Sequence, residues 1–310
     1  MKQRIDYIDN AKGILILLMV IGHIFPHGYV QTFIYTFHMP AFFVINGILF
    51  HYSSSLRMPV HKMILQRTYS LLVPFLFFEI IAMFVQMYVY GVLLNVKGYI
   101  YGLLTLTYYN DPCWFLIATF CANVIFVLLQ KIKNDYIIGT ITVVITVFCY
   151  WNPLQITQPD ILRSGLALGF ITLGYYGSKL LLMDSKIYFF VSIVITVVVS
   201  AMQGETSFVE FNFKNPILYV LGAISGTYMI LFIAKIFKST LIEYLGKNSL
   251  IVMATHWLFI MCIHKYCGTI DLPVSVGIIT LIVIVGLEFP ICYLMGKYIP
   301  FLVGKRKNVR

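Results

Sequence analysis

The sequence has few charged residues. Only 11% of its 310 residues are Asp, Glu, Lys or Arg, whereas a soluble domain has about 25%. Water cannot solvate so apolar a surface, because 60% of the residues are hydrophobic. The 25 Phe and 22 Tyr fit a bilayer protein instead, since aromatic rings fill helix interfaces and Tyr settles at the headgroup level.

Several motifs are also missing. The six cysteines form no C-x-x-C pair and lie mostly in apolar segments, so we interpret them as small core residues. The net charge of +10 comes with no RNA- or DNA-binding pattern, which argues against a nucleic-acid partner. No repeat or low-complexity tract is visible, and we expect one domain over residues 1–310. Residues 13–22 resemble a signal-peptide core, but Asp6 and Asp9 precede them and no A-x-A site follows, which predicts a retained helix.

Apolar stretches of the length that a bilayer requires recur along the whole chain. A hydrocarbon layer of ~30 Å needs about 17 to 25 apolar residues in helical form, and ten such spans can be placed. They are 10–27, 32–51, 70–92, 113–130, 136–151, 163–182, 187–203, 216–237, 247–264 and 274–298. The prediction is an all-α integral membrane protein, a bundle of about ten transmembrane helices.

The basic residues predict the orientation of this bundle. With ten spans, 18 of the 22 Lys and Arg residues fall on the side of the N-terminus, the even-numbered connections and the C-terminus. The opposite side has only Lys97, Arg163, Lys214 and Lys265. Since cytoplasmic loops are rich in Lys and Arg, both termini are predicted to be cytoplasmic, in a multi-pass protein of the plasma (inner) membrane.

Polar side chains inside the spans are few and therefore informative, because an ionisable group in lipid needs a cavity or a partner. They are His23, His38, Asn46, Glu79, His256 and Glu288. Each histidine can also be a structural residue that bonds a neighbouring helix, and the two glutamates can be packing contacts or proton carriers. His23 and His27 have a spacing that suits zinc, but no carboxylate or cysteine lies near in sequence, and no metal is expected.

The first helix combines a basic entrance with a deep imidazole. Asp9, Lys12 and His23 share one stripe, because eleven residues are about three turns and return within roughly 20° after a rise of ~16 Å. Such a stripe can guide an anionic ligand from the cytoplasmic surface to a group that exchanges a proton near neutral pH. Arg67, at the entry of the third span, is either a topology determinant or a contact for a phosphate.

Six short motifs follow one another in a recognisable order. They are Ile5 to Gly13, Gly22-His23, Phe37 to Gly47, Arg67 with Leu71 to Pro74, Trp114 to Leu116, and Leu245 to Leu250 followed by His256. Together they resemble the integral-membrane acyltransferase family 3, which O-acylates sugars, polysaccharides and lipids. The Lys12-Gly13 form with Asp9 before it is most similar to the branch of fucose acetylase-like and exopolysaccharide O-acetyltransferases.

The resemblance implies a catalytic His23 and an acetyl-CoA or other acyl-CoA donor that enters from the cytoplasm. Donor or substrate contacts are implied for Asp9, Lys12, Asn46, Arg67, Glu79, Trp114, Asn248 and His256. The chain departs from the family pattern at two positions. Lys12 stands where an arginine is frequent, which keeps the charge but loses the bidentate fork, and Ser70 stands where the family often has a second arginine.

The predicted function is a membrane O-acetyltransferase that acts on a sugar, a polysaccharide or a lipid-linked saccharide. His23 would act as general base on the acceptor hydroxyl, and an acyl-histidine intermediate is the second mechanism. Two other functions stay open. One is a polytopic transporter, although no paired repeat with broken helices is seen, and the other is a non-catalytic partner of a polysaccharide synthase.

Overall fold

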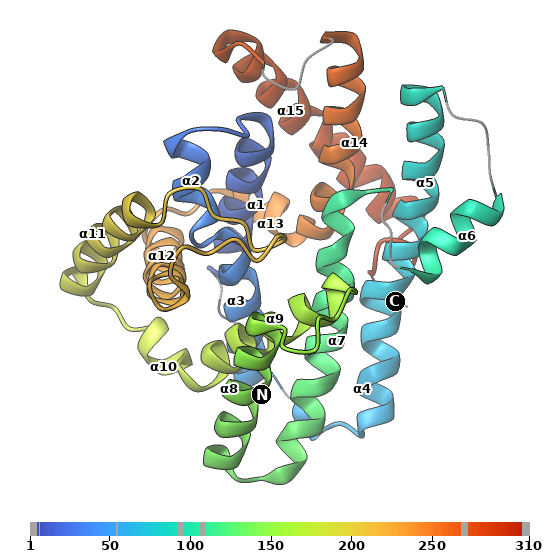
Figure 1. Ribbon diagram of the computed structural model, residues 1–310. Coiled ribbons are helices and arrows are strands. Elements are labelled where there is room, and N and C mark those ends of the chain that lie inside the picture. The colour runs from blue at the N-terminus through green and yellow to red at the C-terminus, as the bar shows by residue number, and fades with distance from the viewer. Residues whose placement is uncertain are drawn as a thin grey trace.

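The computed structural model describes residue 5 and residues 7–53, 55–91, 96–105, 109–267 and 272–305. Within these ranges all regular structure is helical, apart from one isolated bridge between Ser207 and Asn212. Figure 1 shows the helices packed side by side as one bundle. The predicted all-α membrane fold is confirmed.

The helices follow one another with short connections. In chain order they are α1 (Ile8–Ile24), α2 (Tyr29–Tyr35), α3 (His38–Tyr52), α4 (Val60–Arg67), α5 (Val73–Tyr90), α6 (Val96–Leu104), α7 (Trp114–Leu129), α8 (Asp135–Trp151), α9 (Pro159–Tyr176), α10 (Ser178–Leu181), α11 (Lys186–Gln203), α12 (Pro216–Ile236), α13 (Thr240–Lys247), α14 (Ser249–Cys267) and α15 (Val274–Tyr298). A π-helical turn, η2 (Thr68–Leu72), joins α4 to α5, and the 3-10 turn η3 (Asp111–Cys113) precedes α7.

Seven helical stretches in the described residues are long and apolar enough to cross a membrane. They are Tyr29–Tyr52, Val60–Tyr90, Asp111–Ile132, Lys186–Gln203, Pro216–Ile236, Ser249–Cys267 and Val274–Tyr298. The three other predicted spans coincide with α1, α8 and α9, of which α8 is a shorter apolar helix. The number of crossings and the cytoplasmic location of both ends stay predictions, and the basic residues Lys2, Arg4, Arg306, Lys307 and Arg310 lie outside the described residues.

The third span differs from its predicted bounds. It begins at Val60 rather than at residue 70, because α4 continues through η2 into α5 as one helical stretch of 31 residues. The prediction left out the segment that contains Lys62 and Arg67, because these charged residues lower its mean hydropathy. Its backbone is nevertheless as helical as that of the apolar part. The consequence is that Arg67 projects from a helix instead of a loop.

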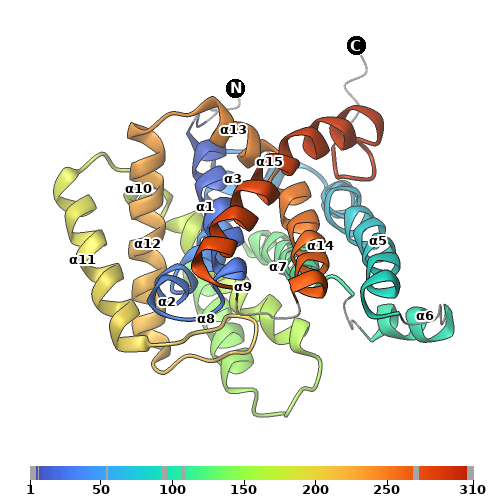
Figure 2. The ribbon, with the colours of Figure 1, turned by 90° about the horizontal axis from the view of Figure 1, so that it is seen from above.

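Helix α1 is the wall that the two halves of the bundle share. It packs against α3 and α12 on one side and against α13, α14 and α15 on the other. Its first half contributes Ala11 and Leu15 to one hydrophobic core, and its second half contributes Met19 and Val20 to the other. Figure 2 shows α1 enclosed by these neighbours. His23 is therefore carried on the most central helix.

Glycine allows α3 and α9 to approach closely. A Cβ at Gly47 would overlap the backbone carbonyl of Ile171, and a Cβ at Gly174 would overlap that of Val44. Small residues at a helix crossing are the usual means of bringing membrane helices together, since lipid provides no hydrophobic drive for it. This contact holds α9, and with it Arg163, beside the helix that carries Asn46.

Candidate active site

A cavity of about 560 Å³ runs between α1, α3, α7, α9, η2 and α14. Five of the predicted site residues line it: Lys12, His23, Asn46, Arg67 and Trp114. They come from α1, α3 and α7 and from the end of α4, so only the packing of the bundle brings them together. The sequence prediction of a basic entrance and a deep imidazole in one space agrees with this arrangement.

The length of the cavity can be estimated along helix α7. The Arg163 guanidinium lies over the Trp114 ring at the start of α7, 5.3 Å from its centroid. The Arg67 guanidinium lies 4.8 Å from the Phe50 centroid, and Phe50 packs against Phe126. Trp114 and Phe126 are twelve residues apart, about 18 Å along the helix axis. The cavity thus has two distinct ends, one near Arg67 and one near Arg163.

The end near Arg67 is basic. Lys12 and Arg67 both line it, and the Lys12 Nζ is 2.7 Å from an Asp9 carboxylate oxygen. Asp9 does not line the cavity, and the substrate contact predicted for it stays a prediction. Two cations beside an apolar cavity suit a ligand with phosphate groups and a long uncharged part.

His23 lies deeper, within a cluster of rings. Its ring centroid is 5.2 Å from His256, 5.2 Å from Trp257 and 6.3 Å from Tyr35. The imidazole is half-buried and faces the cavity. An imidazole in such a place is screened from water but accessible to a ligand, which is what a general base requires.

Two more histidines flank this cluster, and their backbone contacts decide their tautomers. The Nδ1 of His256 lies 2.9 Å from the Val252 carbonyl oxygen, and the Nδ1 of His38 lies 3.0 Å from that of Ile34. A carbonyl only accepts, so each Nδ1 carries the proton and each neutral ring presents Nε2 as an acceptor. The His256 Nε2 is buried without a hydrogen-bond partner among the described residues, although the His23 ring is adjacent.

Trp114 and Asn46 line the cavity through contacts that also hold the helices together. The Trp114 ring is stacked on Phe208 at 5.7 Å. The Asn46 Nδ2 donates to the Asn123 Oδ1 at 2.6 Å, which joins α3 to α7. Both residues therefore have a packing function, and the substrate contacts predicted for them stay predictions.

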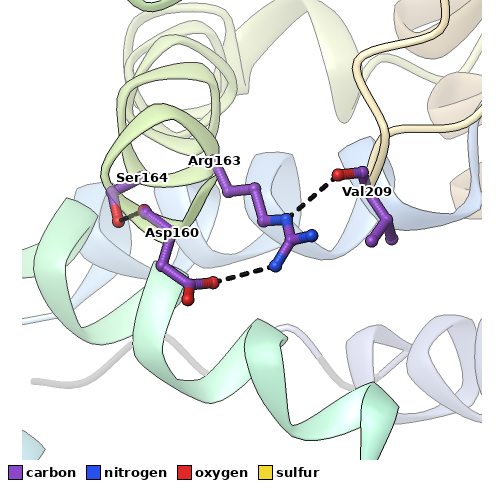
Figure 3. Close-up of polar contacts among 4 residues, drawn as sticks. All are labelled: Asp160, Arg163, Ser164 and Val209. Carbon is purple, nitrogen blue, oxygen red and sulfur yellow. Dashed lines mark hydrogen bonds and ion pairs between the residues drawn. The ribbon is translucent and has the colours of Figure 1, made fainter. Parts of the chain in front are cut away.

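Arg163 is a cavity residue that the sequence analysis counted only as a loop charge. Figure 3 shows its guanidinium between Asp160 and the loop that follows α11. The Nη1 donates to the Asp160 Oδ1 at 3.0 Å, and the Nε donates to the Val209 carbonyl at 3.1 Å. Arg163 thus fixes the loop whose Ser207, Phe208 and Glu210 line this end of the cavity. Asp160 and Arg163 lie one helical turn apart, and this spacing was the sequence signal from which their ion pair could have been predicted.

Four predicted site residues do not line the cavity: Asp9, described above, and Glu79, Asn248 and His256. The Glu79 carboxylate accepts from the backbone N–H groups of Tyr109 at 2.8 Å and Asn110 at 3.2 Å, so it holds the segment that leads into η3. The Asn248 Oδ1 accepts from Lys305 near the end of the described chain. His256 differs from these two because it lies directly behind His23.

Residues 5–297 match the family model described as Acyltransferase domain, the acyltransferase 3 family. No curated protein and no solved structure matches the chain. The match spans every helix that contributes to the cavity.

Proposed function

Because the chain belongs to the acyltransferase 3 family and is a multi-pass membrane acyltransferase, we propose that it transfers an acetyl group from cytoplasmic acetyl-CoA to a hydroxyl of a sugar or polysaccharide in the plasma membrane. One observation supports this most strongly. A single cavity has two cations at one end, His23 in its depth and mixed acidic, basic and hydroxyl groups at its other end.

The basic end suits the donor. Coenzyme A carries phosphate groups on one side and a long thin arm that ends in the thioester. Lys12 and Arg67 would attract the phosphates, while the apolar walls formed by Ile16, Met19 and Leu71 accept the arm. Lys12 to His23 is a rise of ~16 Å, a distance that suits a ligand with such an arm.

The far end suits the acceptor. Asp111, Glu210 and Ser207 line it beside Arg163, and carboxylates and hydroxyls are the groups that bond the many hydroxyls of a sugar. Trp114 and Phe208 add apolar surface at the same place. An acceptor bound there would present one hydroxyl towards His23.

His23 would act as the general base. Its free ring nitrogen takes the proton of the acceptor hydroxyl while the hydroxyl oxygen attacks the thioester carbonyl carbon. The tetrahedral intermediate then breaks its carbon–sulfur bond, and the proton passes from His23 to the departing CoA thiolate. We assign His256 a positioning role, because its unpartnered Nε2 can accept the other N–H of His23 and thereby fix the tautomer.

The test is acetyl-CoA turnover by the purified protein in detergent, followed by thiol release with a panel of mono- and oligosaccharides. We expect His23→Ala to lower kcat by about 10²- to 10⁴-fold, the usual contribution of a general base. The control is His61→Ala, since His61 is exposed on α4 and does not line the cavity.

Three outcomes would contradict parts of the proposal. An unchanged rate in His23→Ala would remove the base from the mechanism and favour a non-catalytic partner of a synthase. Rapid thiol release before acceptor is added, with label retained on His23, would show an acyl-histidine instead of direct transfer. No acetyl-CoA consumption with any acceptor would favour a transporter, because a transporter has no gradient to use in detergent.

A further inference from the structure

A second cavity lies beside the end of α15. It has a volume of about 720 Å³ and is lined by the turn at Gln66, Tyr69 and Ser70 and by the segment from Tyr298 to Lys305. The central cavity has room for a thioester arm and an acceptor, but coenzyme A also has a large phosphorylated nucleotide. The nucleotide end of the proposed donor therefore needs a binding site of its own.

The two cavities are neighbours, because they share two walls. On the first wall, Arg67 and Leu71 line the central cavity whereas Tyr69 and Ser70, on the same turn, line the second. On the other wall, Ser249 lines the central cavity, and the preceding Asn248 bonds Lys305 in the second. The two cavities therefore adjoin the same helical turn and the same junction between α13 and α14.

The shared turn has an unusual backbone. Residues Thr68–Leu72 form a π-helix, which inserts one extra residue into a helical turn and is frequent at functional sites. Gly304 faces this turn with a positive φ of 73°, and a Cβ there would lie 2.7 Å from the Ser70 carbonyl oxygen. The glycine thus lets the segment after α15 close against the π-helical turn.

The lining combines aromatic rings with a positioned cation. The rings of Tyr69 and Phe301 pack against each other, with centroids 5.5 Å apart and planes tilted by 53°. Both side chains are exposed, so a purine can stack on the outer face of either ring. The Lys305 Nζ is held by the Asn248 Oδ1, and burial lowers the pKa of Lys305. An amine that is partly desolvated and fixed in place binds a phosphate more strongly than a mobile surface lysine does.

We propose that this second cavity binds the adenine and the 3′-phosphorylated ribose of the acyl-CoA donor, with Lys305 at the phosphate and Tyr69 and Phe301 at the base. The pantetheine arm then passes Arg67 into the central cavity and places the thioester near His23. This assignment rests on the proposed acyl-CoA donor, and it gives Asn248 a role in positioning Lys305.

The experiment compares two donors that have the same reactive end. Acetyl-CoA carries the nucleotide, and acetyl-pantetheine lacks it. We expect Lys305→Gln to reduce the ratio of kcat/KM for acetyl-CoA to that for acetyl-pantetheine by about ten-fold or more, the value of one charge-assisted hydrogen bond. Tyr69→Leu should reduce the same ratio, and adenosine 3′,5′-bisphosphate should inhibit the native protein more strongly than the Lys305→Gln variant.

The matched control is Lys297→Gln. Lys297 lies on the last turn of α15, its Nζ is 3.3 Å from the Tyr293 hydroxyl, and it lines neither cavity. The Lys297→Gln substitution removes the same charge near the same surface. The ratio of kcat/KM for acetyl-CoA to that for acetyl-pantetheine should stay at the native value.

Other results would overturn the assignment. A ratio that Lys305→Gln leaves unchanged would mean that Lys305 does not contact the donor phosphate, and an unchanged ratio in Tyr69→Leu would mean that Tyr69 does not contact the base. An equal loss with both donors would mean that Lys305 only supports the fold. Native protein that uses neither donor would refute the acyl-CoA function itself, a result distinct from failure of the nucleotide site alone.

Discussion

At the scale of single residues, several side chains that face a cavity are held by a neighbouring side chain or lie beside one. The His256 Nδ1 lies on the Val252 carbonyl, and the centroid of its ring lies 5.2 Å from that of the His23 ring. Asp9 holds Lys12, Asn248 holds Lys305, and Asp160 holds Arg163. In each pair one residue faces a cavity and the other limits its motion, so that less entropy is lost when a ligand binds.

The pair of histidines leads to a prediction for His256. Replacing it by Leu removes the acceptor that we assign to the His23 N–H, and kcat should fall about ten-fold, as expected for one hydrogen bond of ~1.4 kcal/mol. His256→Gln restores an acceptor and should recover part of the rate. Steady-state kinetics of both variants, with their melting temperatures, is the measurement.

A merely structural His256 would give a different result. Both variants would then lose thermal stability, and the activity per folded molecule would equal that of the native chain. An unchanged kcat in His256→Leu at native stability would also contradict the positioning role.

At the scale of elements, close helix contacts decide where the site residues lie. Helices α3 and α9 meet through Gly47 and Gly174, where no side chain fits. The same crossing brings Arg163 to the start of α7 and keeps Asn46 against Asn123. The cavity therefore depends on the absence of side chains at two positions that lie outside it.

Substitution at this crossing tests the dependence. Gly174→Ala places a methyl group on the Val44 carbonyl, and overpacking of this kind costs about 1–3 kcal/mol. The melting temperature in detergent should fall, and acetyl-CoA turnover should fall with it because α9 moves away from α3.

Gly139→Ala is the matched control. Gly139 lies in α8 with no atom near its missing Cβ, and alanine is the better helix former. The melting temperature of this variant should equal or exceed the native value. Equal stability of Gly174→Ala and the native chain would show that the helices are not in contact there.

At the scale of the whole molecule, the bundle separates two ends of one cavity. The distribution of Lys and Arg along the chain predicts that the basic end, with Lys12 and Arg67, faces the cytoplasm. The start of α1, α13 and the end of α15 lie along one edge of the bundle in Figure 2. Donor and acceptor would thus approach His23 from different ends.

The predicted orientation in the membrane can be tested with a native cysteine. Of the six cysteines, Cys267 at the end of α14 is the exposed one, and the ten-span topology places it outside the cell. A membrane-impermeant maleimide should label Cys267 in intact cells. A cysteine introduced by Lys62→Cys in a Cys267→Ala background should react only after permeabilisation.

Labelling of the Lys62→Cys variant but not of Cys267 in intact cells would mean that the orientation is the reverse of the predicted one. Labelling of both cysteines in intact cells would instead show that the number of crossings between them is wrong. Cys267→Ala alone should give no signal in intact cells, because the five other native cysteines are buried or half-buried.

The sequence alone determined the membrane environment, the approximate position of each long helix and the stripe of Lys12 and His23, because these depend on hydropathy and on spacing along the chain. The order of its short motifs also indicated the family, by resemblance. The tertiary structure alone decided that Glu79 caps a backbone segment, that Arg163 bonds Val209 and that Asn248 bonds Lys305. These contacts join residues 31, 46 and 57 positions apart, and helix packing, which periodicity does not encode, brings them together.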